Sequence, residues 1–354
     1  MLLEGLQLPL TTPFYPDGRL NLRKLEHNVR RYSKTPVAGL AALSGAGEPT
    51  MLSEEETRQV LRCVLEAAAV EKVLLAGVSR DSVLETLRLA EHAAELGYDA
   101  VLVKQPSVFQ AGVGGAAMKS LLTYFQTVAD RSALPVVLYN MASELGNLLT
   151  IELVSELAGH PQIIGLVDGV AGAERIAKLK AATVSVKRDV SVTLVFAAAT
   201  GRLQARREVV AGGFISANTL TDGGAALAVA PPKPAVKTRT KVVGFQILVA
   251  NTVGVLEGLR AGAVGAMPAF AAAAPQACYE VLAAWKDGNE GLAEEKQTRL
   301  HDVAVRVEGR LGMAGIKYGC DLNGYYGGWP RLPLLSLSGE ERAEIEGLME
   351  GLRN

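Results

Sequence analysis

Three side chains that could take part in chemistry lie at or just beyond the ends of short apolar runs. Lys104 follows the run at 100–103, Tyr139 ends the run at 135–139, and Asp168 follows the run at 163–167. A carboxylate such as Asp168 can act as a general base, and a lysine can act as a nucleophile when burial lowers its pKa. Side chains alternate along a strand, so Asp168 should point to the opposite face from Val167. We therefore take Lys104, Tyr139 and Asp168 as the candidate catalytic residues.

The segments that would position these residues alternate between strands and helices. A capping-box pattern, Ser53 followed by Glu56, predicts the start of one helix. Continuous apolar strands separated by helices are typical of a parallel sheet covered on both faces. Strands are predicted at residues 6–14, 37–43, 73–78, 100–103, 135–139, 163–167, 241–245 and 263–269. Eight such units predict a (β/α)8 TIM barrel over residues 1–275, because the alternative, a doubly wound open sheet, normally has a glycine-rich turn after strand one that is absent here.

Two regions depart from this alternation. Residues 276–354 predict helices at 276–286, 289–312 and 339–352 without strands between them, so we expect a C-terminal helical region. About seventy residues separate strands six and seven, where a connection needs far fewer, which indicates an insertion at about 185–240. Within it, 191–199 could be an extra strand or helix, and 221–240 lacks periodicity. We interpret the insertion as a surface segment, with a lid over the active site or a subunit contact as the alternatives.

Composition and charge restrict the possible partners. The 354 residues are 49% hydrophobic, which suits one large core, and 36 basic against 37 acidic residues give no overall field that would attract nucleic acid or a membrane surface. Cys63, Cys278 and Cys320 are too few and too far apart for a disulfide framework or a zinc site. We read no signal peptide and no membrane span. These features predict a cytoplasmic protein that binds a small molecule and uses no metal or cofactor.

Several ordered motifs resemble one enzyme family, the dihydrodipicolinate synthase and N-acetylneuraminate lyase family. They are Leu8-Pro9-Leu10-Thr11-Thr12-Pro13-Phe14, Ser44-Gly45-Ala46-Gly47-Glu48, Leu138-Tyr139-Asn140, Gly165-Leu166-Val167-Asp168, the Gly262, Gly265 and Ala266 rhythm, and Trp329-Pro330-Arg331-Leu332-Pro333. The resemblance covers most of the chain outside the insertion. It implies a lyase or aldolase scaffold assembled as a homodimer or homotetramer, and a proton-donor role for Tyr139.

The departures from the family pattern gather where a 2-keto acid would sit. The resemblance places the Schiff-base lysine at Val167, the two carboxylate-binding threonines at Gly45 and Ala46, and an arginine at Glu144. A valine has no amine to condense with a ketone, and a glutamate repels an acidic substrate. The predicted substrate-binding residues are therefore Thr12, Gly45, Ala46, Gly47, Glu144 and Val167, with standard Schiff-base pyruvate chemistry absent.

The sequence leaves three interpretations open. The chain could be an enzyme that uses Tyr139 and Asp168 for acid–base chemistry on a small, weakly charged molecule. It could instead be a non-catalytic relative that binds a ligand or a partner, in which case Tyr139 only fills the barrel interior. It could also be a lyase that uses Lys104, since Schiff-base barrels of the transaldolase type carry their lysine on strand four. An apolar, filled barrel mouth would favour the second interpretation, and convergent polar groups would favour the first.

Overall fold

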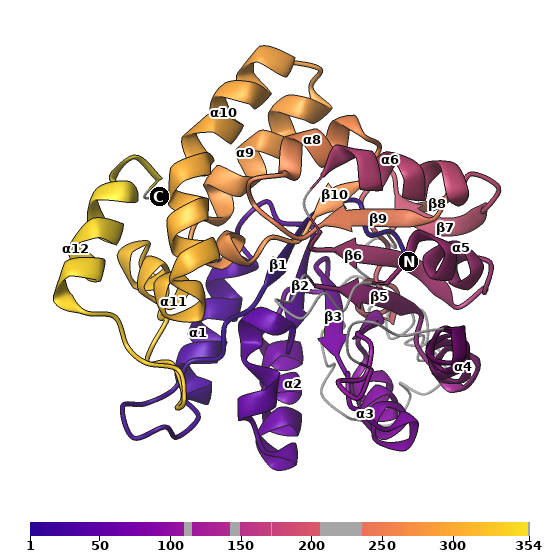
Figure 1. The fold of residues 1–354 in the computed structure, drawn as a ribbon, viewed down its shortest axis with the longest axis horizontal. Helices are drawn as coiled ribbons and strands as arrows, with labels where there is room; N and C mark the ends of the chain where they lie inside the picture. The colour runs from indigo at the N-terminus through magenta and orange to yellow at the C-terminus, as the bar shows by residue number, and fades with distance from the viewer. Residues whose placement is uncertain (110–114, 142–148, 171, 206–235, 353–354) are drawn as a thin grey trace, which may run out of the picture.

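The computed structural model describes residues 1–109, 115–141, 149–170, 172–205 and 236–352. Eight parallel strands close into a barrel in the order β1-β10-β9-β6-β5-β4-β3-β2, which confirms the predicted (β/α)8 fold (Figure 1). The barrel strands are β1 (Gly5–Pro9), β2 (Gly39–Ala42), β3 (Val73–Gly77), β4 (Ala100–Val103), β5 (Val136–Asn140), β6 (Ile163–Asp168), β9 (Gln246–Val249) and β10 (Gly265–Ala266).

Helices return the chain from the carboxyl end of each strand to the start of the next. They are α1 (Leu22–Tyr32), α2 (Glu54–Ala67), α3 (Val83–Leu96), α4 (Gly115–Arg131), α5 (Ile151–Ala158), α6 (Ala173–Ala182) and α8 (Val255–Arg260). Helix α2 begins with the predicted capping box: the Ser53 hydroxyl accepts from Glu56 N–H, and the Glu56 carboxylate accepts from Ser53 N–H. The apolar residues of helices and outward-facing strand positions form one continuous core around the barrel.

The C-terminal region packs against one side of the barrel (Figure 1). It contains α9 (Pro275–Lys286), α10 (Glu290–Val303), the π-helical segment η5 (Ala304–Arg310), α11 (Gly312–Leu322), α12 (Gly339–Leu348) and the short 3-10 turn η6 (Glu350–Leu352). The predicted helices at 276–286, 289–312 and 339–352 are confirmed, but the sequence pattern missed α11. This helix contains Gly315 and Gly319, and a side chain at either position would collide with neighbouring segments.

The prediction of barrel strand seven at 241–245 is wrong. Residues 241–243 belong to β8 (Thr238–Val243), which pairs antiparallel with β7 (Arg188–Thr193) outside the barrel. The true seventh strand, β9, begins with the buried side chain of Gln246. Its Oε1 accepts from Leu3 N–H at 2.7 Å, and its Nε2 donates to Met1 O at 3.0 Å. Because both ends of its amide are hydrogen-bonded, Gln246 can lie in the barrel interior. Glutamine is polar, so the apolar pattern did not predict a strand that begins with it.

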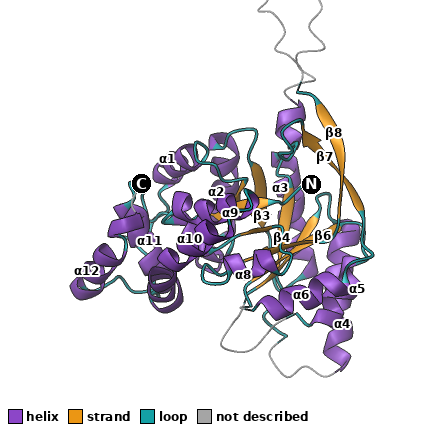
Figure 2. Ribbon diagram, turned by 90° about the horizontal axis from the view of Figure 1, so that it is seen from above, coloured by secondary structure: helices purple, strands orange, loops and turns teal. Residues whose placement is uncertain are grey.

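The described part of the insertion lies at the amino ends of the barrel strands, opposite the end where barrel active sites form (Figure 2). Val190 and Val192 of β7 pack on Leu2, just before β1. After β7, Thr200 Oγ1 donates to Val70 O at 2.5 Å and Gly201 N–H donates to the Asp99 carboxylate at 3.0 Å. The lid interpretation is therefore wrong for these residues, because α6 returns the chain to this end before the insertion begins. Most of the aperiodic stretch, through residue 235, lies outside the described residues.

Candidate functional site

The barrel interior at the level of Tyr139 is apolar. Tyr139 of β5 lies beside Val167 of β6, and Val167 lies beside Leu248 of β9. Val167 has no exposed surface and Tyr139 has 9%. The buried residues of this inner cluster are Leu3, Ala41, Val73, Leu75, Ala100, Leu102, Val137, Tyr139, Ile164, Val167, Leu248, Ala250 and Met267. Among these hydrophobic residues, Tyr139 carries a polar group, its phenol.

Tyr139 and Gly45 meet across the barrel mouth. The Tyr139 hydroxyl accepts a hydrogen bond from Gly45 N–H at 3.1 Å. Burial raises the pKa of Tyr139, and the Gly45 N–H opposes that shift in part. A Cβ atom at position 45 would stand 3.1 Å from the hydroxyl oxygen, which is a tight contact. Glycine at this position therefore permits the tyrosine to approach the backbone.

The predicted substrate-binding residues of the first two strands come together beside this contact. Gly45, Ala46 and Gly47 form the short turn η1 (Gly45–Gly47) after β2. Thr12 follows β1, and its hydroxyl donates to Gly47 O at 2.7 Å, so it holds the turn in place. Nearby, the hydroxyl oxygen of Ser44 is buried and has no hydrogen-bond partner in the described part of the chain. Glu144, the remaining predicted substrate-binding residue besides Val167, lies outside the described residues.

Asp168 faces away from the barrel interior and is fully buried. Its carboxylate accepts from Arg175 Nε at 2.7 Å, Asn140 Nδ2 at 2.9 Å and Val170 N–H at 3.1 Å. Arg175 also donates to Leu149 O at 2.7 Å. Three donors occupy the carboxylate on the opposite face from Val167, as strand alternation predicted. This geometry does not support Asp168 as a general base at the barrel mouth; it connects the ends of β5 and β6 to α6.

Lys104 has an exposed side chain just after β4. Its backbone N–H donates to Ser79 Oγ at 2.9 Å, which fixes the chain but leaves the amine in solvent. The interpretation of Lys104 as a nucleophile required a buried amine, since desolvation is what lowers a lysine pKa. Exposure of this side chain does not provide that environment.

A buried lysine exists elsewhere, on α11. Lys317 is 1% exposed and forms an ion pair with Glu48, which ends the η1 turn and is itself 4% exposed. The Lys317 ammonium donates to Trp329 O at 2.9 Å and lies 4.5 Å from the centre of the Phe14 ring. Burial lowers the pKa of Lys317 and the Glu48 carboxylate opposes this. The pair anchors the C-terminal region to the loop that carries Gly45.

Glu308 is the polar residue near the site that the sequence did not reveal. It lies on η5, and its carboxylate accepts from Thr252 N–H and Ala269 N–H, each at 3.2 Å, just after β9 and β10. Burial raises the pKa of Glu308, and these N–H groups oppose the shift. Its negative charge in turn raises the pKa of Tyr139. The sequence pattern did not predict this residue, because only tertiary packing brings its carboxylate to the barrel mouth. Its location on the π-helical segment η5 is notable, since such segments are frequent at functional sites.

The described residues offer no metal site, since no three histidine, cysteine or acidic side chains cluster among them. None of the three cysteines, Cys63, Cys278 and Cys320, forms a disulfide bond. In the same ranges no helix is both long and apolar enough to cross a bilayer.

Comparison with known proteins agrees with the fold. The model of the Dihydrodipicolinate synthetase family matches residues 2–192 and 236–351, leaving out the centre of the insertion. The chain is 26% identical over 349 residues to a 4-hydroxy-tetrahydrodipicolinate synthase of Acidiphilium cryptum, covering 99% of this chain and 98% of that one. It is 27% identical over 362 residues to an L-threo-3-deoxy-hexylosonate aldolase of Hypocrea jecorina, with 99% and 95% coverage.

Among solved structures, the chain is similar to YagE of E. coli K12, a prophage protein of the dihydrodipicolinic acid synthase family crystallised in complex with pyruvate. The TM-score is 0.74 at 22% identity, and 99% of each chain is covered. At this identity the similarity establishes the fold alone.

Proposed function

Since the chain belongs to the dihydrodipicolinate synthetase family, we propose that it is a divergent member whose barrel mouth receives a small, weakly charged molecule and forms no Schiff base with it. The single observation that carries this proposal is the environment of Val167. This residue stands where the resemblance places the lysine, and it is fully buried between Tyr139 and Leu248. A Schiff base needs an amine that reaches the bound carbonyl carbon, and a valine side chain supplies none.

The neighbouring backbone supports the same proposal. A 2-keto acid needs donors for its carboxylate, and the resemblance places those donors at Gly45 and Ala46, which have no hydroxyl. The Gly45 N–H is already donated to Tyr139. Neither Lys104, which is exposed, nor Lys317, which is paired with Glu48, supplies the missing amine. A neutral ligand fits this mouth better than an acid.

Borohydride trapping with pyruvate tests the proposal. The protein is incubated with pyruvate and sodium borohydride, and its intact mass is measured beside that of a family member that binds pyruvate covalently. We expect no mass shift in this protein. Val167→Lys alone should also remain unmodified, since the new amine would lack carboxylate donors. An adduct on the parent protein would overturn the proposal, and its disappearance in Lys104→Ala would make Lys104 the nucleophile.

Glu308 supports a second candidate function, which is acid–base chemistry without a covalent intermediate. The Glu308 carboxylate raises the pKa of the Tyr139 phenol, and burial raises the pKa of the carboxyl group itself. At one barrel mouth such a pair could remove a proton next to a carbonyl group and donate one to its oxygen. In this version Glu308 takes the role of base that the sequence had assigned to Asp168.

Deuterium exchange tests this second function directly. Neutral hydroxycarbonyl compounds such as dihydroxyacetone and glyceraldehyde are incubated with the protein in D2O, and loss of their C–H signals is followed by NMR. Exchange should be faster than in buffer and should be lost in Glu308→Gln and in Tyr139→Phe, but not in the exposed control Glu340→Gln. Exchange no faster than in buffer would instead favour a non-catalytic binding relative.

Cytoplasmic location and a homo-oligomeric state stay predictions from the sequence.

A further inference from the structure

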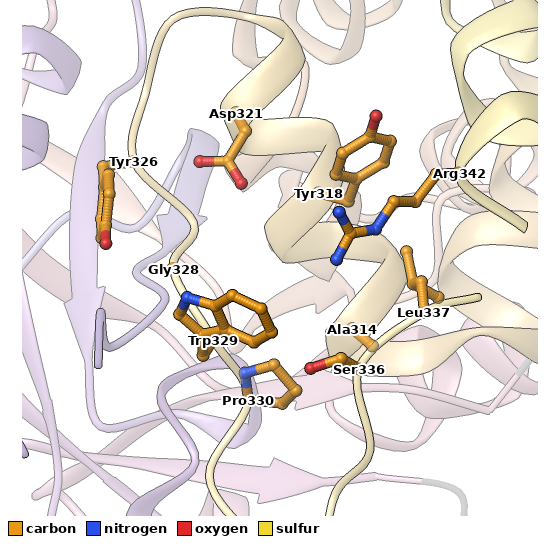
Figure 3. Close-up of a pocket in the computed structure, with 10 residues that line it drawn as sticks. All are labelled: Ala314, Tyr318, Asp321, Tyr326, Gly328, Trp329, Pro330, Ser336, Leu337 and Arg342. Atoms are coloured by element: carbon orange, nitrogen blue, oxygen red, sulfur yellow. The ribbon is translucent and has the colours of Figure 1, made fainter. Parts of the chain in front are cut away.

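A separate cavity lies within the C-terminal region, between the end of α11, the segment that follows it and the start of α12 (Figure 3). Its volume is about 170 Å³. Drug-sized ligands occupy pockets of roughly 300–1,000 Å³, so this cavity suits a smaller molecule. Trp329 is 42% exposed at its rim, which gives a ligand access from solvent.

The cavity holds two opposite charges. The Asp321 carboxylate and the Arg342 guanidinium both point into it (Figure 3). Asp321 comes from the last turn of α11, and its Oδ1 accepts from Gly327 N–H at 2.9 Å, which fixes its direction. Arg342 comes from α12, and its guanidinium carbon lies 5.4 Å from the centre of the Tyr318 ring.

These two charges do not satisfy each other. No ion pair joins Asp321 to Arg342 in the described part of the chain, although each lies within electrostatic range of the other. The Arg342 Nε atom is buried and lacks a hydrogen-bond partner among the described residues. A guanidinium held against an aromatic ring with a buried, unused donor is an arrangement that recognises a carboxylate.

Most of the remaining walls are apolar, apart from the hydroxyl groups of Ser336, Tyr318 and Tyr326. Trp329, Pro330 and Leu337 line the cavity beside the charged pair. A simple anion would be repelled by Asp321, and a simple cation would be repelled by Arg342. A ligand that carries both charges on a small frame, with an apolar group for the indole and the leucine, matches all of these surfaces.

We propose that this cavity binds a free α-amino acid with an apolar side chain. The ligand ammonium group donates to Asp321, the ligand carboxylate accepts from Arg342, and the side chain packs on Trp329 and Leu337. This site uses no residue of the barrel mouth, so it stands independently of the proposed function.

Tryptophan fluorescence provides a direct readout on the full chain. The sequence contains two tryptophans, Trp285 and Trp329. In a Trp285→Phe background, Trp329 is the only reporter, and titration with L-leucine or L-phenylalanine should change its emission in a saturable way. N-acetyl-L-leucine lacks the positive charge and L-leucinamide lacks the carboxylate, so each should bind at least about tenfold more weakly.

Variants of the two charged residues complete the test. Asp321→Asn keeps an acceptor for Gly327 N–H, and Arg342→Gln keeps the side-chain packing, so both should fold while binding at least about tenfold more weakly. Asp287→Asn and Arg310→Gln, which alter exposed residues outside the cavity, should bind like the parent. The proposal is overturned if the parent shows no saturable change up to about 10 mM ligand, or if both single-charge analogues bind as well as leucine. Should either variant fail to fold, the analogues decide the question on the parent.

Discussion

The hydroxyl of Tyr139 accepts a hydrogen bond from the backbone N–H of Gly45 at 3.1 Å. This contact joins the end of β5 to the turn after β2, across the mouth of the barrel. It depends on glycine, because a Cβ atom at position 45 would press on the hydroxyl. The amide that could have held a ligand carboxylate is therefore used within the protein, which makes the mouth less suited to an acid.

Tyr139→Phe should reduce stability because it leaves the Gly45 N–H without its acceptor. A partly buried donor that loses its partner costs about 1–3 kcal/mol. Urea unfolding followed by circular dichroism measures the change, and Tyr15→Phe, at an exposed tyrosine, is the matched control. If the two variants were equally stable, water would be replacing Tyr139 as the acceptor for the Gly45 N–H, and the contact across the barrel mouth would not contribute to stability.

Asp168→Asn should destabilise the protein by about 3–5 kcal/mol, since it leaves Arg175 with an uncompensated charge in a mostly buried place. Arg175→Met should cost a similar amount, and the double variant should cost clearly less than the sum of the two. Additive losses in the same unfolding assay would show that the ion pair does not couple β6 to α6. A catalytic role alone would predict normal stability for Asp168→Asn.

Lys317→Met should also lower the free energy of unfolding by about 3–5 kcal/mol, because it leaves the Glu48 carboxylate, which is only 4% exposed, without its positively charged partner. Glu48→Gln removes the other partner and tests the same pair. The exposed variant Lys178→Met, which breaks a surface pair with Glu174, is the control and should change stability by less than about 1 kcal/mol. Equal effects of the buried and surface variants would contradict an anchoring role for Lys317.

The sequence predicted the parts of this molecule that depend on local pattern. Alternation along β6 places Val167 inside and Asp168 outside, and the capping box at Ser53 starts α2 where expected. Strand seven was misplaced because Gln246 is buried through hydrogen bonds to the first residues of the chain. No local pattern contains that information.

The candidate site was less predictable, because its polar groups come from distant segments. Glu308 reaches the barrel mouth only through the packing of η5 beside β9 and β10. Asp168 resembled a base when only its position at a strand end was known. The structure shows that Arg175, seven residues later on α6, occupies its carboxylate.

The pair of Glu56 and Arg331 should give the protein a pH-dependent stability. Arg331 donates to both oxygens of Glu56, at 2.6 and 2.7 Å, and ties the C-terminal segment to α2. Hydrogen bonds from this guanidinium lower the pKa of Glu56 below its usual value of 4.5. A carboxyl group whose pKa is lower in the folded state releases its proton more readily there than in the unfolded chain. The pair therefore stabilises the protein fully above pH 4.5, and this stabilisation is lost as the pH falls through the folded pKa.

Glu56→Gln isolates this contribution, since glutamine can still accept from Ser53 N–H and keep the capping box of α2. The variant should be less stable than the parent by about 1–2 kcal/mol at pH 7. The difference should shrink as the pH is lowered from 5 towards 3, because the parent then protonates Glu56 and loses the same interaction. Urea unfolding at a series of pH values measures both curves. A difference that stayed constant over this range would mean that Glu56 has the same pKa in both states, and that Arg331 holds the segment through its hydrogen bonds to Gly18 O and Met51 O alone.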